Sequence, residues 1–251
     1  MYDAFIIARL NSSRLVRKNV MPILDVPMII HLANRIKHSK KVNKIIITTS
    51  DQATDDELEE VAKKYGFDCY RGSLDNLMQR ISDAAKYFDS QNIIEILGDN
   101  PLIHSSLIDS VIDLYESGNY DYVANISKDY GNFANGKELF SIGLRVQIYK
   151  AQAAFDHVKF PEYLSNGKHP SAYIFEHSEK YKIKYLEAKD SWSFMNQPDL
   201  NFSVNYPKNF ELNKKIFEEN YLHDNNFNLE TIFKQLDQQP ELLSLFGAEW
   251  L

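Results

Sequence analysis

A cluster of cations and hydroxyls lies close to the amino terminus. Within ten residues the chain carries four basic side chains and two serines, which are Arg9, Ser12, Ser13, Arg14, Arg17 and Lys18. The apolar run from Ala4 to Ala8 precedes them and indicates a buried strand. A triphosphate carries about four negative charges and needs several converging donors, and ligands bind at the carboxyl ends of strands in open parallel sheets. The pattern predicts a phosphate site, against the alternative of a solvated basic loop before a helix.

The loop differs from two common phosphate motifs. It lacks the glycines and the Gly-Lys-Ser/Thr ending of a Walker-type loop, and it lacks the Gly-x-Gly-x-x-Gly turn of dinucleotide-binding domains. Kinase and NAD-binding functions are therefore disfavoured.

Asp99 is the carboxylate best placed for a metal ion. It follows the apolar run from Asn92 to Leu97, with Gly98 before it and Pro101 two residues after it. This context predicts a sharp turn at the ligand-binding edge of the sheet. Mg²⁺ prefers one or two protein carboxylates together with phosphate oxygens and water. Asp99 is therefore a predicted Mg²⁺ ligand, although a structural turn would also explain it.

Short apolar runs alternate with helical spacing, which predicts an α/β fold of βαβ units around a mostly parallel sheet. We expect strands at 4–8, 44–49, 68–70, 92–97 and 122–126, a strand-like run at 138–149 and a last core strand at 201–204. Helical spacing covers 28–36, 58–62, 77–85 and 107–115, with further helices near 151–158 and 170–176, from Pro207, and within 228–251. We expect one domain over 1–251 with a small substrate or dimerisation arm at about 127–190.

Composition narrows the function classes. The 251 residues carry a formal charge of −7, which disfavours binding to a nucleic acid polymer. The sequence has no apolar run of the ~20 residues that cross a bilayer, and its start does not resemble a secretory signal. We expect a cytoplasmic protein without a membrane span.

The basic loop resembles a known signature. Residues 8–18 are similar to the Ala-Arg-x-x-Ser-Ser/Thr-Arg-Leu-Pro-x-Lys motif of the CTP-dependent sugar cytidylyltransferases, and most of all to their spore-coat polysaccharide branch. The 3-deoxy-manno-octulosonate cytidylyltransferases and CMP-sialic acid synthetases are more distant. Val16 and Arg17 replace the usual Pro-Gly. The resemblance implies a Rossmann-like nucleotide-diphospho-sugar transferase fold.

Three further segments extend the resemblance. They are Thr48 to Asp51 with the acidic residues Asp55 and Asp56, then Tyr70 to Arg80, and Gly98 to Ile103. The resemblance implies nucleotide contacts from Ala8, Arg9, Leu10, Asn11, Ser12, Ser13, Lys18, Arg71, Gly72, Ser73 and Asp75, and catalytic roles for Arg9, Arg14, Lys18 and Asp99. Ser73 as a helix cap and Asp75 in the first helical turn are the structural alternatives.

The match weakens towards the carboxyl terminus. Asn205 stands where family members carry a second metal-binding Asp, and an amide oxygen can still coordinate Mg²⁺ but adds no charge. In the arm, only fragments of the family's motifs are present in this sequence. Glu138, Lys168, His169 and Tyr173 are candidates for substrate contact, with a dimer-interface role as the alternative for each.

The resemblance implies an Mg²⁺-dependent transfer of CMP from CTP to an acidic 2-keto sugar, with release of pyrophosphate, in a homodimeric enzyme of surface polysaccharide biosynthesis. Transfer to a sugar phosphate or alditol phosphate is one alternative, although those enzymes usually carry a glycine-rich loop in place of residues 11–13. A non-catalytic nucleotide-binding or assembly protein is another, because of Asn205 and the altered arm. A glycosyltransferase is disfavoured because the expected Asp-x-Asp motif is replaced by Gly98-Asp99-Asn100.

Overall fold

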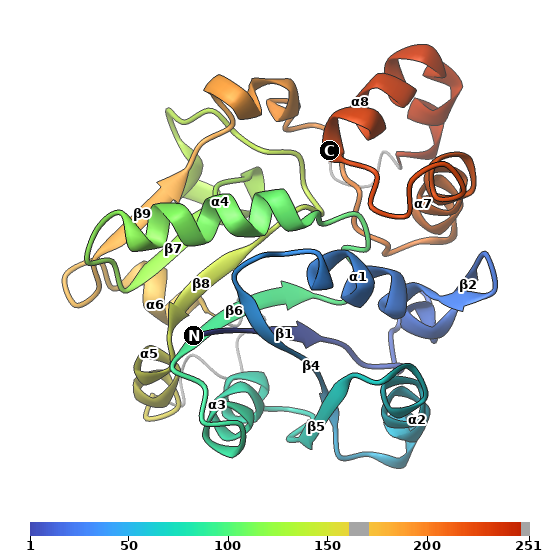
Figure 1. Cartoon of the computed structure of the whole chain (residues 1–251). Coiled ribbons are helices and arrows are strands. Elements are labelled where there is room, and N and C mark those ends of the chain that lie inside the picture. Colours follow the sequence, from blue (N-terminus) through green and yellow to red (C-terminus); the bar gives the residue numbers. More distant parts are fainter. Residues whose placement is uncertain (161–170, 247–251) are drawn as a thin grey trace.

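A seven-stranded sheet in the order β5-β4-β1-β6-β8-β7-β9 forms the centre of the molecule (Figure 1). The computed structural model describes residues 1–160 and 171–246. The strands are β1 (Tyr2–Ile7), β4 (Val42–Ser50), β5 (Asp68–Gly72), β6 (Asn92–Leu97), β7 (Tyr122–Asn125), β8 (Gln147–Lys150) and β9 (Ile183–Leu186), and a separate hairpin joins β2 (Pro22–Ile23) to β3 (Val26–Pro27).

Parallel pairing dominates the sheet. β1 pairs in parallel with β4 and β6, β4 with β5, and β7 with β9. β8 pairs antiparallel with both β6 and β7, so within the described part of the chain it alone runs against the other strands of this sheet. The carboxyl ends of β1, β4 and β6 therefore meet at one edge, where ligands of such folds bind.

Helices cover both faces of the sheet (Figure 1). They are α1 (Met28–Lys37), α2 (Asp56–Tyr65), α3 (Leu77–Tyr87), α4 (Ser105–Glu116), α5 (Ala151–His157), α6 (Ala172–Glu176), α7 (Pro207–Asn220) and α8 (Leu229–Gln238). Residues of α1, α2, α4, α7 and α8 share one buried cluster, and residues of α3, α5 and α6 share another. Successive residues of β1 enter opposite clusters, since Ala4 and Ile6 belong to the first and Phe5 and Ile7 to the second. This alternation is the side-chain period of a strand covered on both faces.

The predicted α/β fold with a mostly parallel sheet is confirmed. The expected strands of the first half occur within two residues of their predicted bounds, and β6 matches them. The helices expected from Ala151 and from Pro207 begin at these residues. No helix of the described chain is long and apolar enough to cross a membrane.

Two predictions from the second half are wrong. The run at 138–149 is not one strand, because only its last residues enter β8 and Gly143 adopts a positive φ of 85° that interrupts the extended backbone. Residues 201–204 form no strand. Asn201 makes an isolated bridge to Ile142, and the segment belongs to neither described sheet. β9 was not predicted. The helix expected near 170–176 is confirmed in its described part, since α6 runs from Ala172 to Glu176, and Pro170 lies outside the described residues.

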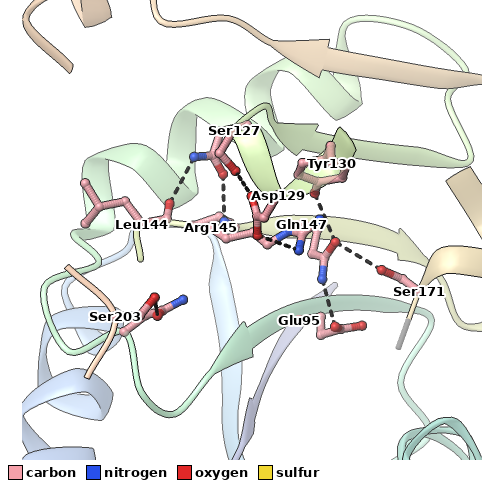
Figure 2. Close-up of polar contacts among 12 residues, drawn as sticks. Glu95, Ser127, Asp129, Tyr130, Leu144, Arg145, Gln147, Ser171 and Ser203 are labelled. Carbon is pink, nitrogen blue, oxygen red and sulfur yellow. Dashed lines mark hydrogen bonds and ion pairs between the residues drawn. The ribbon is translucent and has the colours of Figure 1, made fainter. Parts of the chain in front are cut away.

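A buried polar group joins β8 to the middle of the sheet. Gln147 Nε2 donates to Glu95 Oε1 at 2.7 Å (Figure 2), and the Tyr149 hydroxyl donates to Glu95 Oε2 at 2.6 Å. Burial raises the pKa of Glu95 to about 7, against the lowering effect of these two donors and the nearby charge of Arg145. The antiparallel strand is therefore held to β6 by side chains as well as by its ladder.

Gly143 allows two backbone segments to approach closely. A Cβ atom at this position would lie 2.3 Å from the backbone nitrogen of Ser203 and 2.7 Å from the carbonyl carbon of Phe202. The Ile142 nitrogen donates to the Leu200 oxygen at 2.9 Å, and the Phe202 nitrogen donates to the Ile142 oxygen at 2.9 Å. This contact fixes the segment before β8 against the segment before α7.

Gly143→Ala should destabilise the fold by about 3 kcal/mol or more, because the added Cβ would clash with backbone and the residue would need a left-handed conformation. Gly136→Ala is the matched control, since Gly136 also has a positive φ but a Cβ added there would meet no atom within 4 Å. It should lose only about 1–2 kcal/mol. Urea unfolding followed by circular dichroism measures both losses, and equal losses would contradict the close approach.

Candidate active site

The basic loop and Asp99 lie at the same sheet edge. Residues 8–18 follow β1, and Asp99 follows β6, which is the parallel neighbour of β1. Gly98 is part of this junction, since its nitrogen donates to the Ile7 oxygen at 2.8 Å. A Cβ at Gly98 would lie only 3.0 Å from the Ala8 side chain and from the Ile7 oxygen. Glycine therefore lets the turn that carries Asp99 lie directly against the start of the loop.

Lys18 connects the loop to both predicted metal ligands. Its Nζ donates to Asp99 Oδ2 at 2.8 Å, to the Val204 carbonyl oxygen at 2.7 Å and to Asn205 Oδ1 at 3.0 Å. Lys18 is only 7% exposed. The three contacts use all three N–H groups of the ammonium. Residues from three distant parts of the sequence thus converge on one buried cation.

The same oxygens could suit a divalent ion. One carboxylate and two neutral oxygens point towards the position of the Lys18 ammonium, and oxygen donors of this kind are those that Mg²⁺ prefers. The described residues contain no group of three or more His, Cys, Asp or Glu side chains that could hold a metal. A site built from protein ligands alone does not fit these donors, and a role for Asp99 and Asn205 in holding Mg²⁺ together with phosphate oxygens stays a prediction.

Backbone hydrogen bonds shape the loop around Leu10. The Leu10 oxygen accepts from the nitrogens of Ser12 and Arg17, each at 2.9 Å, so it closes the loop on itself. The Asn19 amide donates to the Arg9 oxygen at 3.0 Å. Within this frame the side chains of Arg9, Asn11, Ser13 and Arg14 are exposed, Ser12 is half-buried, and Ala8 and Leu10 are buried. The loop therefore presents its polar side chains to solvent, where a ligand can reach them.

Asp55 is a positioning residue that the sequence analysis treated only as part of an acidic helix start. It is 1% exposed, and its Oδ1 accepts from the Leu10 nitrogen at 2.7 Å. Its Oδ2 accepts from the Ser50 nitrogen at 3.2 Å and from the Ser50 hydroxyl. Burial alone would raise the pKa of Asp55, but these donors hold it below the ordinary value. The useful signal was its place just after β4, beside the end of β1.

Arg17 forms an ion pair with α2. It adopts a positive φ of 59°, at the position where the resembling motif has glycine, and its guanidinium pairs with Glu57 at 2.5 Å. Arg14 lies over the ring of Tyr206, with 5.7 Å between Cζ and the ring centroid. The extra cation is thus directed to α2, whereas Arg14 faces the segment that carries Asn205.

The second predicted nucleotide segment is tied to α2. Arg71 pairs with Asp56 at 2.6 Å and Glu59 at 2.9 Å, and it donates to the backbone oxygens of Ser50 and Gln52. Gly72 is crowded, because a Cβ there would lie 3.1 Å from side-chain atoms of Arg80 and Tyr70. The predicted contacts of Arg71 and Gly72 with a nucleoside remain predictions.

The structural expectations for Ser73 and Asp75 are wrong. α3 begins at Leu77 and its N-cap is Asn76, whose side chain accepts from the Gln79 nitrogen at 2.9 Å. Ser73 instead accepts from the Asn76 nitrogen at 3.0 Å in the preceding turn, and Asp75 lies before the helix rather than in its first turn. Asn is as good a cap as Ser, so the helix starts later than the serine suggested. Their nucleotide contacts remain predictions.

The predicted acceptor contacts are scattered. Glu138 accepts from the Asn196 amide, and Tyr173 is buried in α6 between the rings of His157, Phe160 and His177. Lys168 and His169 lie outside the described residues. A role for these residues in acceptor binding stays a prediction.

Asp55→Ala should raise the Kd for CTP about tenfold or more, because the Leu10 N–H loses its buried acceptor and the loop loses its anchor. Asp55→Asn keeps an acceptor for Leu10 and should recover most of this affinity. Isothermal titration with CTP measures both values, and thermal denaturation reports stability separately.

Ser50→Ala is the matched control, since it removes a donor to the same carboxylate but leaves the contact with Leu10. It should lower stability and leave the Kd for CTP within about twofold. If Asp55→Ala and Ser50→Ala weaken CTP binding equally, Asp55 does not act through Leu10.

Comparisons with known proteins identify the family of the chain. A family model described as Cytidylyltransferase matches residues 4–235. The spore coat polysaccharide biosynthesis protein SpsF of Bacillus subtilis is 27% identical over 215 residues, which cover 84% of each chain. A 3-deoxy-manno-octulosonate cytidylyltransferase of Nitratiruptor is 35% identical over 112 residues, which cover 43% of this chain and 44% of that protein.

Solved structures show the same fold. A cytidylyltransferase from Leptospira borgpetersenii superposes with a TM-score of 0.82 at 24% identity, covering 100% of this chain and 98% of that one. A CMP:2-keto-3-deoxy-manno-octonic acid synthetase complexed with CTP has a TM-score of 0.64 at 13% identity, covering 87% of this chain and 98% of that one. The family model covers nearly the whole chain. The chain therefore belongs to the cytidylyltransferase family.

Proposed function

We propose that this cytidylyltransferase transfers CMP from CTP to a hydroxyl of an acidic 2-keto sugar and releases pyrophosphate, in a pathway of surface polysaccharide biosynthesis. The observation that carries the proposal is the convergence of the basic loop, Lys18 and Asp99 at the sheet edge. Relatives named for spore coat polysaccharide and for 3-deoxy-manno-octulosonate support the acceptor class.

In the proposed reaction the acceptor hydroxyl releases its proton to solvent water, and its oxygen forms a bond to the α-phosphorus of CTP. The bond from this phosphorus to the bridging oxygen breaks, and pyrophosphate leaves with its electron pair. Arg9, Arg14 and Lys18 offset the negative charge on the phosphates, and Asp99 holds the Lys18 ammonium at the sheet edge. These residues position the phosphates and stabilise their charge, and the reaction forms no covalent enzyme intermediate.

Mg²⁺ is part of the proposal, held by Asp99 and Asn205 together with phosphate oxygens. When bound, it would stabilise negative charge on the phosphate oxygens as a Lewis acid. Because Asn205 contributes no charge, the ion would depend on the triphosphate more than in a site with two carboxylates.

Pyrophosphate release tests the proposal. The protein is assayed with Mg²⁺ and each of CTP, UTP, GTP and ATP against a panel of 2-keto sugar acids, sugar phosphates and alditol phosphates. We expect release with CTP and one acid. Lys18→Met should lower kcat about a hundredfold or more, because it removes the buried cation beside the phosphates. Lys214→Met removes a lysine that pairs with Glu218 on the surface of α7, and it should leave the rate unchanged.

Release only with a sugar phosphate or alditol phosphate would replace the acceptor class. CTP binding without release across the whole panel would favour a nucleotide-binding protein that lacks catalysis, the alternative that Asn205 raises. A normal rate in Lys18→Met would remove Lys18 from the reaction.

A further inference from the structure

Arg145 lies beside the candidate active site on a backbone that is held from two sides. The Asn125 side chain, at the end of β7, donates to the Leu144 oxygen at 3.0 Å and accepts from the Val146 nitrogen at 2.7 Å. The neighbouring Gly143 packs on Phe202 and Ser203. Phe202 and Ser203 are followed directly by Val204 and Asn205, whose oxygens accept hydrogen bonds from the Lys18 ammonium. Arg145 therefore belongs to the same edge of the sheet as Lys18.

The guanidinium of Arg145 is buried, but only some of its N–H groups make hydrogen bonds. Its side chain is 5% exposed, and Nη1 donates to Asp129 Oδ2 at 2.9 Å (Figure 2). One face of the group lies on the ring of Tyr130, with 3.7 Å between Cζ and the ring centroid. Nε and Nη2 have no hydrogen-bond acceptor within the described structure. Two donors on one edge of a buried cation are thus unsatisfied.

Arg35 is a buried arginine of the same chain whose guanidinium has a structural role. It is also buried, but its Nε donates to the Ile103 oxygen and its Nη2 to the Leu102 oxygen, both at 3.1 Å. The edge formed by Nε and Nη2 is therefore filled by carbonyl oxygens in Arg35 and unfilled in Arg145.

The unused edge has a defined chemical partner. The N–H groups of Nε and Nη2 lie parallel in one plane, in the geometry that binds both oxygens of a carboxylate. Leaving such donors buried without an acceptor is costly, so the site favours a ligand that supplies two oxygens. Asp129, whose side chain is 37% exposed, connects the guanidinium to the surface.

We propose that the Nε and Nη2 edge of Arg145 binds the carboxylate of the acceptor. The acid approaches past Asp129 and reaches the edge when the short 3-10 segment η3 (Lys128–Ala134), which carries Asp129 and Tyr130, shifts aside. η3 is interrupted at Gly131, where the backbone turns to a φ of 58°. This assignment rests on the proposed function, because it takes the acceptor to be an acid, and it makes Arg145 the residue that selects acids over neutral sugars.

Direct binding tests the assignment without requiring turnover. The acids are 3-deoxy-manno-octulosonate and a nonulosonate, each compared with its C1 carboxamide, and the protein is saturated with the α,β-methylene analogue of CTP so that no transfer occurs. Calorimetry gives the Kd of each compound for wild type, Arg145→Gln, Arg145→Lys and Arg35→Gln.

We expect wild type to prefer at least one acid over its amide. Arg145→Gln should weaken binding of that acid about tenfold or more and abolish the preference, with an unchanged Kd for the nucleotide analogue. Arg145→Lys keeps the charge without the planar edge and should retain part of the preference. Arg35→Gln also loses a buried guanidinium and should keep the full preference.

Equal preference in wild type and both Arg145 variants would overturn the assignment. So would a wild type that binds none of the acids, or a loss of preference in Arg35→Gln as large as in Arg145→Gln. If Arg145→Gln does not fold, Arg145→Lys decides the question. Arg145-dependent acid binding without any pyrophosphate release from CTP would refute the proposed transfer and leave this site in place.

Discussion

The buried ammonium of Lys18 is the interaction on which the rest of the site depends. A lysine charge removed from water is stable only with a paired carboxylate and with acceptors for its remaining N–H groups. Asp99, Val204 and Asn205 supply these acceptors from the turn after β6 and from the segment before α7. The requirement fixes three segments that are far apart in the sequence, and it keeps a positive charge at the sheet edge where phosphates are expected.

The loop itself is held by the acidic start of α2. Asp55 anchors Leu10, and Glu57 pairs with Arg17. Arg71 ties β5 to the same helix through Asp56 and Glu59. These contacts explain how the chain keeps a loop without glycine. Arg17 takes the strained left-handed conformation, and contacts with α2 restrain the backbone on both sides of the exposed side chains of the basic loop.

The first half of the fold could be predicted from sequence because each βαβ unit has a local pattern. β1, β4 and β6 are apolar runs, and the helices between them have regular apolar spacing. The sequence predicted only part of the surroundings of Lys18. Parallel strands place Lys18 and Asp99 at one edge of the sheet, but the contacts of Lys18 with Val204 and Asn205 depend on the fold of the carboxyl-terminal segment. The role of Asp55 was missed, because an acidic residue before a helix is common for reasons of capping and charge.

The second half was less predictable because its structure depends on distant contacts. β8 is short and antiparallel, β9 is a half-buried edge strand, and Gly143 interrupts the run before β8 to meet Ser203. None of these features has a local periodic signature. The role of Arg145 could not be predicted from sequence either, because a single arginine before a strand shows neither its burial nor which of its nitrogen atoms lack an acceptor.

A crystal structure with CTP and Mg²⁺ would show whether Lys18 and the basic loop hold the triphosphate. We expect the triphosphate to lie against residues 9–14, and Lys18 to exchange one of its three contacts for a phosphate oxygen while remaining beside Asp99. A triphosphate bound away from this loop, with all three contacts of Lys18 intact, would contradict the proposed role of the buried ammonium.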